Sequence, residues 1–270
     1  MKRIIAGAAA LLVGFSTAQA QKIKLGEALV FHAPDLKPDA DAKVFEARVL
    51  NELAPAWKLN APGMELHLVR KDRGNHKGQY LLAYTTDTLA RHKSYASATA
   101  EGYPFTADLL AKGNAGTGLT RFVSSDGKYV EYHLVGKVAE LPEVEVLGIH
   151  YIKVRPDRRE AFDRFIAEKL HPTVGNLRPD LKLLYYKPVR GTDAGNYLTI
   201  FALTIASRDK YWPNGKDSDD LKVAFKQVQA LTEELKTYLV EGSYATGNLA
   251  AAVFESREWA DWVQVRAEQR

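Results

Sequence analysis

Apolar residues in the second half of the chain alternate between the two-residue period of strands and the spacing of helices. The run from Val146 to Val154 ends at Arg155-Pro156 and predicts a strand that stops at a proline. The next segment carries phenylalanine and leucine at helical spacing, and Pro172 predicts its end. In chain order the pattern predicts a strand, a helix, two strands, a second helix and a last strand, at residues 146–154, 158–170, 181–187, 196–205, 217–242 and 258–265.

The same pattern occurs twice, because the sequence matches itself when it is shifted by 117 positions. Two copies of one supersecondary unit are the simplest explanation, with a boundary at Glu140-Leu141-Pro142. We therefore predict an α+β protein with one ferredoxin-like β-α-β-β-α-β repeat at residues 21–139 and another at residues 140–270. The first copy has a weaker second helix, between Thr88 and Lys112, and a last strand at residues 129–132. The matched pairs include Phe45 with Phe162, Pro55 with Pro172, Arg73-Gly74 with Arg190-Gly191 and Tyr80-Leu81 with Tyr197-Leu198.

Each predicted antiparallel sheet has one face for its two helices and a second face that also needs a cover. A bare apolar sheet face would be an exposed patch. Packing the two sheets face to face as an α+β barrel covers both, and it predicts a space between the sheets as the ligand pocket.

The motifs of the second copy resemble the dimeric α+β barrel superfamily. A strand ends in Arg155-Pro156, a helix ends in Leu170-His171-Pro172, and a leucine-rich strand follows. That superfamily includes antibiotic-biosynthesis monooxygenase-like domains, stress-responsive barrel domains and the tandem, haem-binding chlorite dismutase-like enzymes. The resemblance covers nearly all of the chain after residue 20 and implies two paired sheets, here within one chain. No family-specific catalytic motif accompanies it, so no single family is assigned.

The N-terminus predicts export. Lys2 and Arg3 precede a short apolar run, and Ala18-Gln19-Ala20 supplies the small residues of a cleavage site, so residues 1–20 are predicted to be a signal peptide and the protein to be periplasmic or secreted. Loss of Lys2 and Arg3 lowers the formal net charge of +4 by two, and no basic block or recognition motif remains, which excludes a nucleic-acid partner. We expect no membrane span. The absence of cysteine excludes disulfides and thiol chemistry.

His150 is the first candidate for chemistry. Strand alternation places it on one face with Val146 and Ile152, and Leu147 and Ile149 suit a helix-covered face better than histidine does. We therefore expect His150 in the space between the sheets, where it handles protons or binds a ligand. The alternative is a core histidine that hydrogen-bonds to its neighbours. Two tyrosines on a nearby predicted strand complete the catalytic candidates with a hydroxyl group, Tyr185 and Tyr186.

Other candidates concern cofactor and ligand binding. His171 is interpreted either as a haem axial ligand or acid/base, or as a cation at the C-terminus of a helix. His32, Tyr84 and Trp262 are predicted to line a ligand pocket, although aromatic residues on strands also form ordinary core. Neither His-x-His nor His-Glu-x-x-His occurs, so no metal site is predicted.

Three functions remain open from the sequence. The first is an exported barrel that binds a small apolar molecule, without a cofactor, and that could carry oxygenase-type activity. The second is a haem protein that resembles the chlorite dismutase-like enzymes, with His171 or His150 as the axial ligand. The third is a non-enzymatic periplasmic accessory protein. Whether the chain is an enzyme is left open, and a homo-oligomer is compatible with each function.

Overall fold

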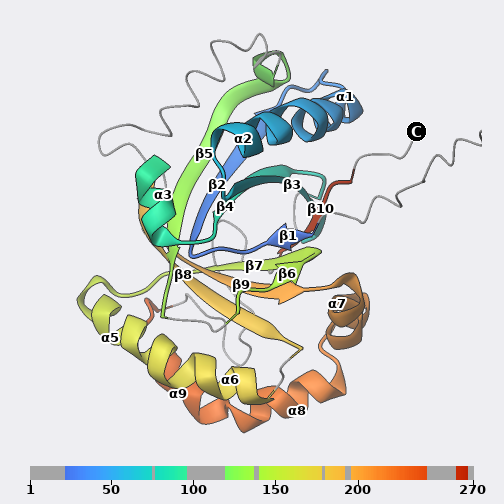
Figure 1. Cartoon of the computed structure of the whole chain (residues 1–270). Helices are drawn as coiled ribbons and strands as arrows, with labels where there is room; N and C mark the ends of the chain where they lie inside the picture. Colours follow the sequence, from blue (N-terminus) through green and yellow to red (C-terminus); the bar gives the residue numbers. More distant parts are fainter. Residues whose placement is uncertain are drawn as a thin grey trace, which may run out of the picture.

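The computed structural model describes residues 22–74, 77–95, 119–136, 140–177, 180–191, 196–241 and 260–266. Within them, eight strands close into one barrel, and two short strands pair beside it (Figure 1). The barrel strands are β2 (Ala28–Leu36), β3 (Met64–Arg73), β4 (Tyr80–Thr86), β5 (Val123–Leu134), β7 (Val146–Ile152), β8 (Lys182–Gly191), β9 (Tyr197–Leu203) and β10 (Ala260–Gln264). The short pair is β1 (Ile23–Lys24) and β6 (Glu143–Val144).

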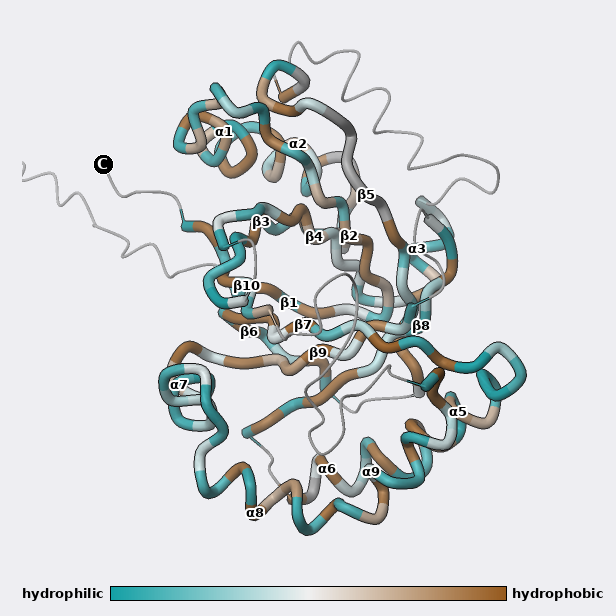
Figure 2. Tube along the Cα trace, turned by 180° about the vertical axis from the view of Figure 1, so that it is seen from behind, coloured by the Kyte–Doolittle hydropathy of each residue, from teal (hydrophilic) through white to brown (hydrophobic). Residues whose placement is uncertain are grey.

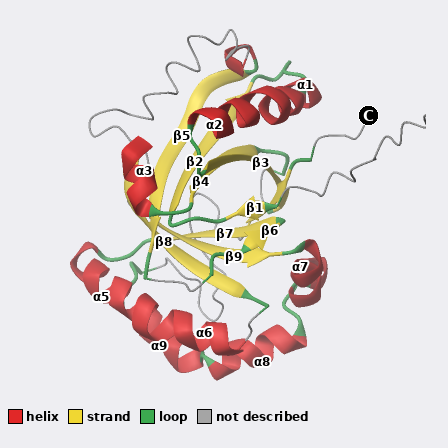
Figure 3. Cartoon of the chain, in the orientation of Figure 1, coloured by secondary structure: helices red, strands yellow, loops and turns green. Residues whose placement is uncertain are grey.

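Helices follow the first and third strands of each half (Figure 3). In the first half these are α1 (Ala42–Arg48), α2 (Ala54–Asn60) and α3 (Leu89–Tyr95). In the second half they are α5 (Arg159–Phe165), α6 (His171–Leu177), α7 (Ile205–Tyr211), α8 (Asp219–Gln227) and α9 (Gln229–Lys236). Short 3₁₀ turns lie at residues 119–121, 156–158 and 213–215. The predicted helix between Thr88 and Lys112 is described only as α3, and its remainder lies outside the described residues.

Each half has the strand order of a ferredoxin-like sheet. The first half runs β3-β4-β2-β5 and the second half runs β8-β9-β7-β10. Antiparallel pairing of β10 with β3 and of β5 with β8 joins the two halves. The strands form a barrel, as predicted, but the two sheets are joined at their edges into one closed barrel and do not meet by face-to-face packing alone. The α+β class is confirmed.

Strand alternation separates two kinds of buried surface. Leu29, Val130 and Leu147 belong to a core that fills the barrel interior. The outer face of the first half packs against α1 and α2, and that of the second half packs against α5, α6, α8 and α9. Figure 2 shows hydrophobic stretches along the strands and alternating hydrophobic and hydrophilic residues along α8 and α9. Packed side chains thus occupy the space that the sequence predicted as a pocket.

A π-helical turn continues the first helix of each half. Residues 49–53 join α1 to α2, and residues 166–170 join α5 to α6. Pro55 and Pro172 follow these turns directly, in the first turns of α2 and α6. The prediction that Pro172 ends the helix is therefore wrong, because the helix runs on through the π-helical turn and past the proline. His171 consequently opens α6 and does not close a helix.

The ends of the chain bear on the export prediction. Residues 1–20, the predicted signal peptide, lie outside the described residues. In the part of the chain that is described, no helix is long and apolar enough to cross a membrane.

Candidate functional site

A row of polar side chains crosses the helix-covered face of the second half. His150 on β7 lies opposite Thr199 on β9, and Thr199 lies opposite Tyr185 on β8. All three are buried, with 2% exposure or less. Ile152 and Leu183, which share their face of the sheet, belong to the core beneath the helices. The row therefore faces the helix layer and not the barrel interior.

His171 adds a second imidazole to this layer from the start of α6. Its ring centroid lies 5.7 Å from that of Tyr185. Burial lowers the pKa of His171 to about 4, so its ring is neutral at pH 7. Among the described residues, neither nitrogen of His171 nor Oγ1 of Thr199 has a hydrogen-bond partner. Leaving such groups unsatisfied costs about 1–3 kcal/mol each, and a ligand placed here would offset that cost.

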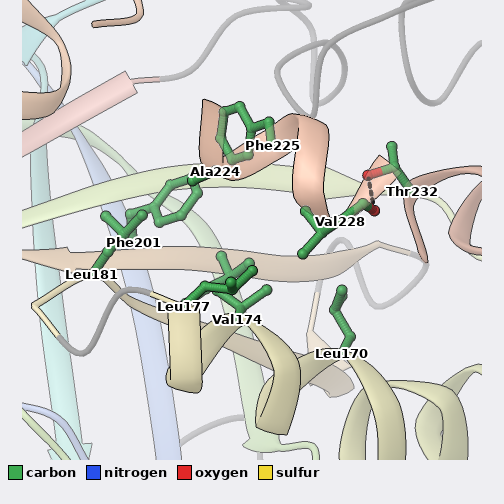
Figure 4. A pocket seen from close by; sticks show the side chains of 10 residues that line it. Leu170, Val174, Leu177, Leu181, Phe201, Ala224, Phe225, Val228 and Thr232 are labelled. Atoms are coloured by element: carbon green, nitrogen blue, oxygen red, sulfur yellow. Dashed lines mark hydrogen bonds between the residues drawn. The ribbon is translucent and has the colours of Figure 1, made fainter. Parts of the chain in front are cut away.

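An apolar cavity lies beside the polar row. Leu183 and Phe201 line it from the sheet, each two residues along its strand from Tyr185 or Thr199. Figure 4 shows side chains of α6 facing those of α8 and α9 across the cavity. Thr232 supplies the one polar side chain of the lining. The site thus combines an apolar space with polar groups at one side of it.

The size of the cavity limits what it can hold. Its volume is about 20 Å³, enough for a water-sized molecule, whereas pockets for drug-sized ligands measure roughly 300–1,000 Å³. A larger ligand requires α8 and α9 to move away from the sheet. The two helices are separated by Val228, whose φ of −103° and ψ of 16° are not helical.

The orientation predicted for His150 is wrong. Leu147 and Ile149 line the barrel interior, and Val146 and Ile152 lie beneath the helices. Both faces of β7 are aliphatic, so the assumption that only the helix-covered face would be aliphatic failed. Tyr185 lies on the same face, two strands away with β9 between. The structure places His150 and Tyr185 in one row and His171 beside Tyr185, but their predicted roles stay predictions.

Tyr186 and Trp262 lie elsewhere, in the barrel interior. The hydroxyl of Tyr186 donates to the carbonyl of Gly26 at 2.9 Å. Burial raises the pKa of Tyr186 far above its usual value, which makes the group a poor proton donor. The ammonium of Lys71 lies 5.0 Å from the centre of the Trp262 ring. The structure therefore separates Tyr186 from the row that contains Tyr185.

His32 and Tyr84 belong to the first half. Tyr84 packs against Trp57 of α2, with 4.6 Å between ring centroids, in the core beneath α1 and α2. His32 is half-buried and shares a face with Val30 of that core. Neither residue lines the cavity of the second half. The candidate site residues predicted from the sequence are thus spread over three separate layers, namely the outer faces of the two halves and the barrel interior.

Haem does not fit the residues as they are arranged. The cavity is more than ten times smaller than ordinary cofactor pockets. Neither His171 nor His150, the two predicted axial ligands, is among the residues that line it. No chemistry of this chain is therefore derived through haem.

A second cavity, of about 150 Å³, lies where β3 and β10 meet. Arg70, Asp72 and Arg208 contribute to its lining. Arg208 Nη1 donates to Asp72 Oδ2 at 2.9 Å. These two charged side chains of the lining therefore already pair with each other across the junction of the two halves. We interpret it as part of that junction.

Comparison with known proteins gives likeness of structure without likeness of sequence. No family model matches the chain, and no curated protein matches it. A Fusobacterium nucleatum protein proposed to be a monooxygenase aligns with a TM-score of 0.48 and 10% identity over 90% of this chain and 94% of that one. A mutant chlorite dismutase from Candidatus Nitrospira defluvii aligns with a TM-score of 0.45 and 10% identity over 88% and 91%.

A third structure is a ferredoxin fold protein from Listeria monocytogenes that is related to antibiotic biosynthesis monooxygenases. It aligns with a TM-score of 0.41 and 13% identity, over 90% of this chain and 96% of that one. The structural neighbours are monooxygenase-like and chlorite dismutase-like proteins. These are groups that the sequence resemblance names. At such scores the alignments carry no argument about function, which has to rest on the site itself.

Proposed function

We propose that this chain binds a small, largely apolar molecule with one polar group, between the outer face of β8 and β9 and the helices α6, α8 and α9. The observation that carries the proposal is the apolar cavity beside a row of buried polar side chains. The hydroxyl of Thr199 and both nitrogens of His171 have no hydrogen bond within the described residues. As the structure has it, neither Thr199 nor His171 lines the cavity. Once α8 and α9 move away from the sheet, the apolar body of a ligand would occupy the enlarged cavity, and its polar group would reach these two residues.

We further propose that the chain catalyses an oxygenase-type reaction on this ligand. His171 supports it, because a neutral imidazole beside the ring of Tyr185 can form a hydrogen bond that orients a bound substrate. If the chain binds the ligand without converting it, its function is that of a non-enzymatic periplasmic accessory protein. Measurement of oxygen consumption with the bound molecule distinguishes the two.

The experiment uses N-phenyl-1-naphthylamine, an uncharged apolar probe whose fluorescence rises on burial. Ala224→Phe, on the cavity side of α8, is expected to fill the space and to reduce the fluorescence of bound probe by at least about tenfold. Val223→Phe is the matched control, because Val223 is the next residue of α8 and is 53% exposed. Filling a packed site costs about 1–3 kcal/mol, so circular dichroism must show that both variants are folded. Equal probe binding in the two variants would contradict the proposal.

We also propose that the chain is exported. The motif Ala18-Gln19-Ala20 supports cleavage after residue 20. The intact mass of protein recovered from outside the cytoplasm is expected to correspond to a chain that starts at Gln21. A recovered chain that keeps Met1 would contradict this.

A further inference from the structure

The outer face of β5, in the first half, carries a separate group of polar side chains. Val130 and Tyr132 point into the barrel interior, so Glu131 and His133 lie on the opposite face. His92 meets them from α3, which lies beside β5 (Figure 1). Residues about 40 positions apart in the sequence thus form one cluster, on the other half of the molecule from the proposed ligand site.

One carboxylate oxygen is the centre of this cluster. Glu131 Oε1 lies 2.8 Å from His92 Nε2 and 3.1 Å from His133 Nε2. The other oxygen, Oε2, accepts a hydrogen bond from Arg190 Nε at 2.5 Å. One candidate ligand atom from each of His92, Glu131 and His133 lies within 4.8 Å of the other two. His92 and Glu131 are buried, and the His133 side chain keeps 14% exposure, so solvent can reach one side.

The carboxylate of this cluster faces three nitrogen groups of the protein. Oε1 lies near the two imidazole nitrogens, and Oε2 lies near the guanidinium of Arg190. The imidazole nitrogens and Oε1 form a donor set of two nitrogens and one oxygen.

We propose that His92, Glu131 and His133 bind a divalent transition-metal ion, with zinc as the best chemical match. Two histidines and one glutamate form a known set of three protein ligands for zinc, and they leave a fourth position open. The same set with open positions also suits other first-row metals. The ion would lie between the two Nε2 atoms and Oε1, where these atoms already converge.

Neighbouring residues provide the supporting contacts that a metal site needs. Thr86 Oγ1 lies 3.4 Å from His92 Nδ1. A histidine that binds metal through Nε2 carries its proton on Nδ1 and needs an acceptor there, which the Thr86 hydroxyl supplies. The pairing of β5 with β8 shifts register between Glu131 and Tyr132. Such irregularities re-aim side chains and occur often next to functional sites.

Arg190 gives the site a testable property. Because Arg190 occupies Oε2, Glu131 can offer the metal only Oε1, and the guanidinium adds a positive charge close to the ion. The surplus positive charge favours an anion, such as hydroxide, at the fourth position. Removal of Arg190 is therefore expected to tighten metal binding, whereas removal of a ligand weakens it.

The test is titration of chelator-treated full-length protein with Co²⁺, followed by visible absorption, with Zn²⁺ as competitor. The wild type is expected to bind one ion per chain, with ligand-field bands that Zn²⁺ abolishes. Glu131→Gln and His133→Gln are expected to weaken binding at least about tenfold, and Arg190→Met to strengthen it severalfold. His67→Gln is the matched control, because His67 is a buried strand histidine that lies 3.3 Å from Glu65, outside the cluster. It should keep the wild-type spectrum.

Three results would overturn the metal site. They are absence of Co²⁺ bands in the wild type, unchanged affinity in His133→Gln, and a loss in Arg190→Met as large as that in Glu131→Gln. If Glu131→Gln fails to fold, the partly exposed His133 decides alone, since its replacement leaves the buried carboxylate paired with Arg190. The outcome is independent of probe binding in the second half, so either proposal can fail without the other.

Discussion

Two threonines of the second half have opposite surroundings. Thr204 is the N-cap of α7, and its hydroxyl oxygen accepts from the backbone N–H of Ser207 at 3.0 Å. The hydroxyl of Thr199 is buried and has no hydrogen bond among the residues that the structure describes. The same chemical group is therefore stabilising at one position and costly at the other, because stability depends on whether a buried polar group is satisfied.

This contrast predicts opposite effects of one substitution. Thr199→Val is expected to leave the free energy of unfolding unchanged or to raise it by up to about 1 kcal/mol, because no hydrogen bond is lost. Thr204→Val is expected to lower it by about 0.5–2 kcal/mol through loss of the cap. Urea unfolding of both variants checks this. A marked loss in Thr199→Val would show that its hydroxyl is satisfied in the folded protein.

His171 predicts a pH dependence of stability. Its pKa falls from 6.5 to about 4 on folding because of burial, so between these values the unfolded chain binds more protons than the folded one. Its contribution is complete above pH 6.5 and is lost as the pH falls toward 4. Wild type should lose about 2 kcal/mol more than His171→Phe between about pH 7 and pH 5. Parallel curves in denaturant unfolding at both pH values would contradict the shift.

At the scale of elements, sequence periodicity located the strands but not their faces. The predicted strands at 146–154, 181–187 and 196–205 correspond to β7, β8 and β9. Alternation could not tell inside from outside, because the barrel interior and the helix-covered layer are both aliphatic. His150 was therefore assigned to the wrong face.

The cluster of His92, Glu131 and His133 was not found in the sequence for a different reason. Its histidines and glutamate come from α3 and β5, and only pairing with β8 adds Arg190. The spacing of Glu131 and His133, two residues apart, was the local signal. It placed two polar side chains on the same face of the strand, opposite Val130, Tyr132 and Leu134 of the core. The partner His92 could not be found from spacing, because tertiary contacts bring α3 to that face.

Two glycines predict how tightly these elements pack. A Cβ on Gly26 would lie 1.9 Å from the backbone oxygen of Thr86, which cannot move without β4. Gly26→Ala is therefore expected to lower the free energy of unfolding by about 2 kcal/mol or more. Gly175 in α6 has open space around its Cβ position, so Gly175→Ala should raise that free energy by about 0.5–1 kcal/mol. Thermal unfolding compares the two, and a stable Gly26→Ala would contradict the close approach of this segment to β4.

At the scale of the whole molecule, the two halves share more than strand pairing. Arg73 of β3 donates to Asp209 of the second half at 2.8 Å, and Arg208 donates to Asp72 at 2.9 Å. Side chains of both halves also fill one common interior. Separation of the halves would expose that interior and four strand edges. We therefore expect neither half to be stable without the other.

A single cooperative transition follows from this shared interior. In Trp57→Phe, the remaining tryptophans all lie after residue 211, so fluorescence reports the second half and its junction with β3, where Lys71 lies beside Trp262. Circular dichroism reports the entire chain. The two signals are expected to give the same denaturant midpoint. Separate midpoints would mean that the halves unfold independently. Light scattering of the same samples measures the oligomeric state, for which a homo-oligomer stays a prediction.

Closure of the barrel within one chain also removes a constraint on the evolution of its sequence. When two identical chains build a barrel, every substitution appears on both sides, so a new feature must be tolerable twice. Here each position occurs once, although both halves have the same strand order. The outer face of one half can carry a charged cluster while the corresponding face of the other carries an apolar space. Each face can therefore diversify alone on a frame that both maintain.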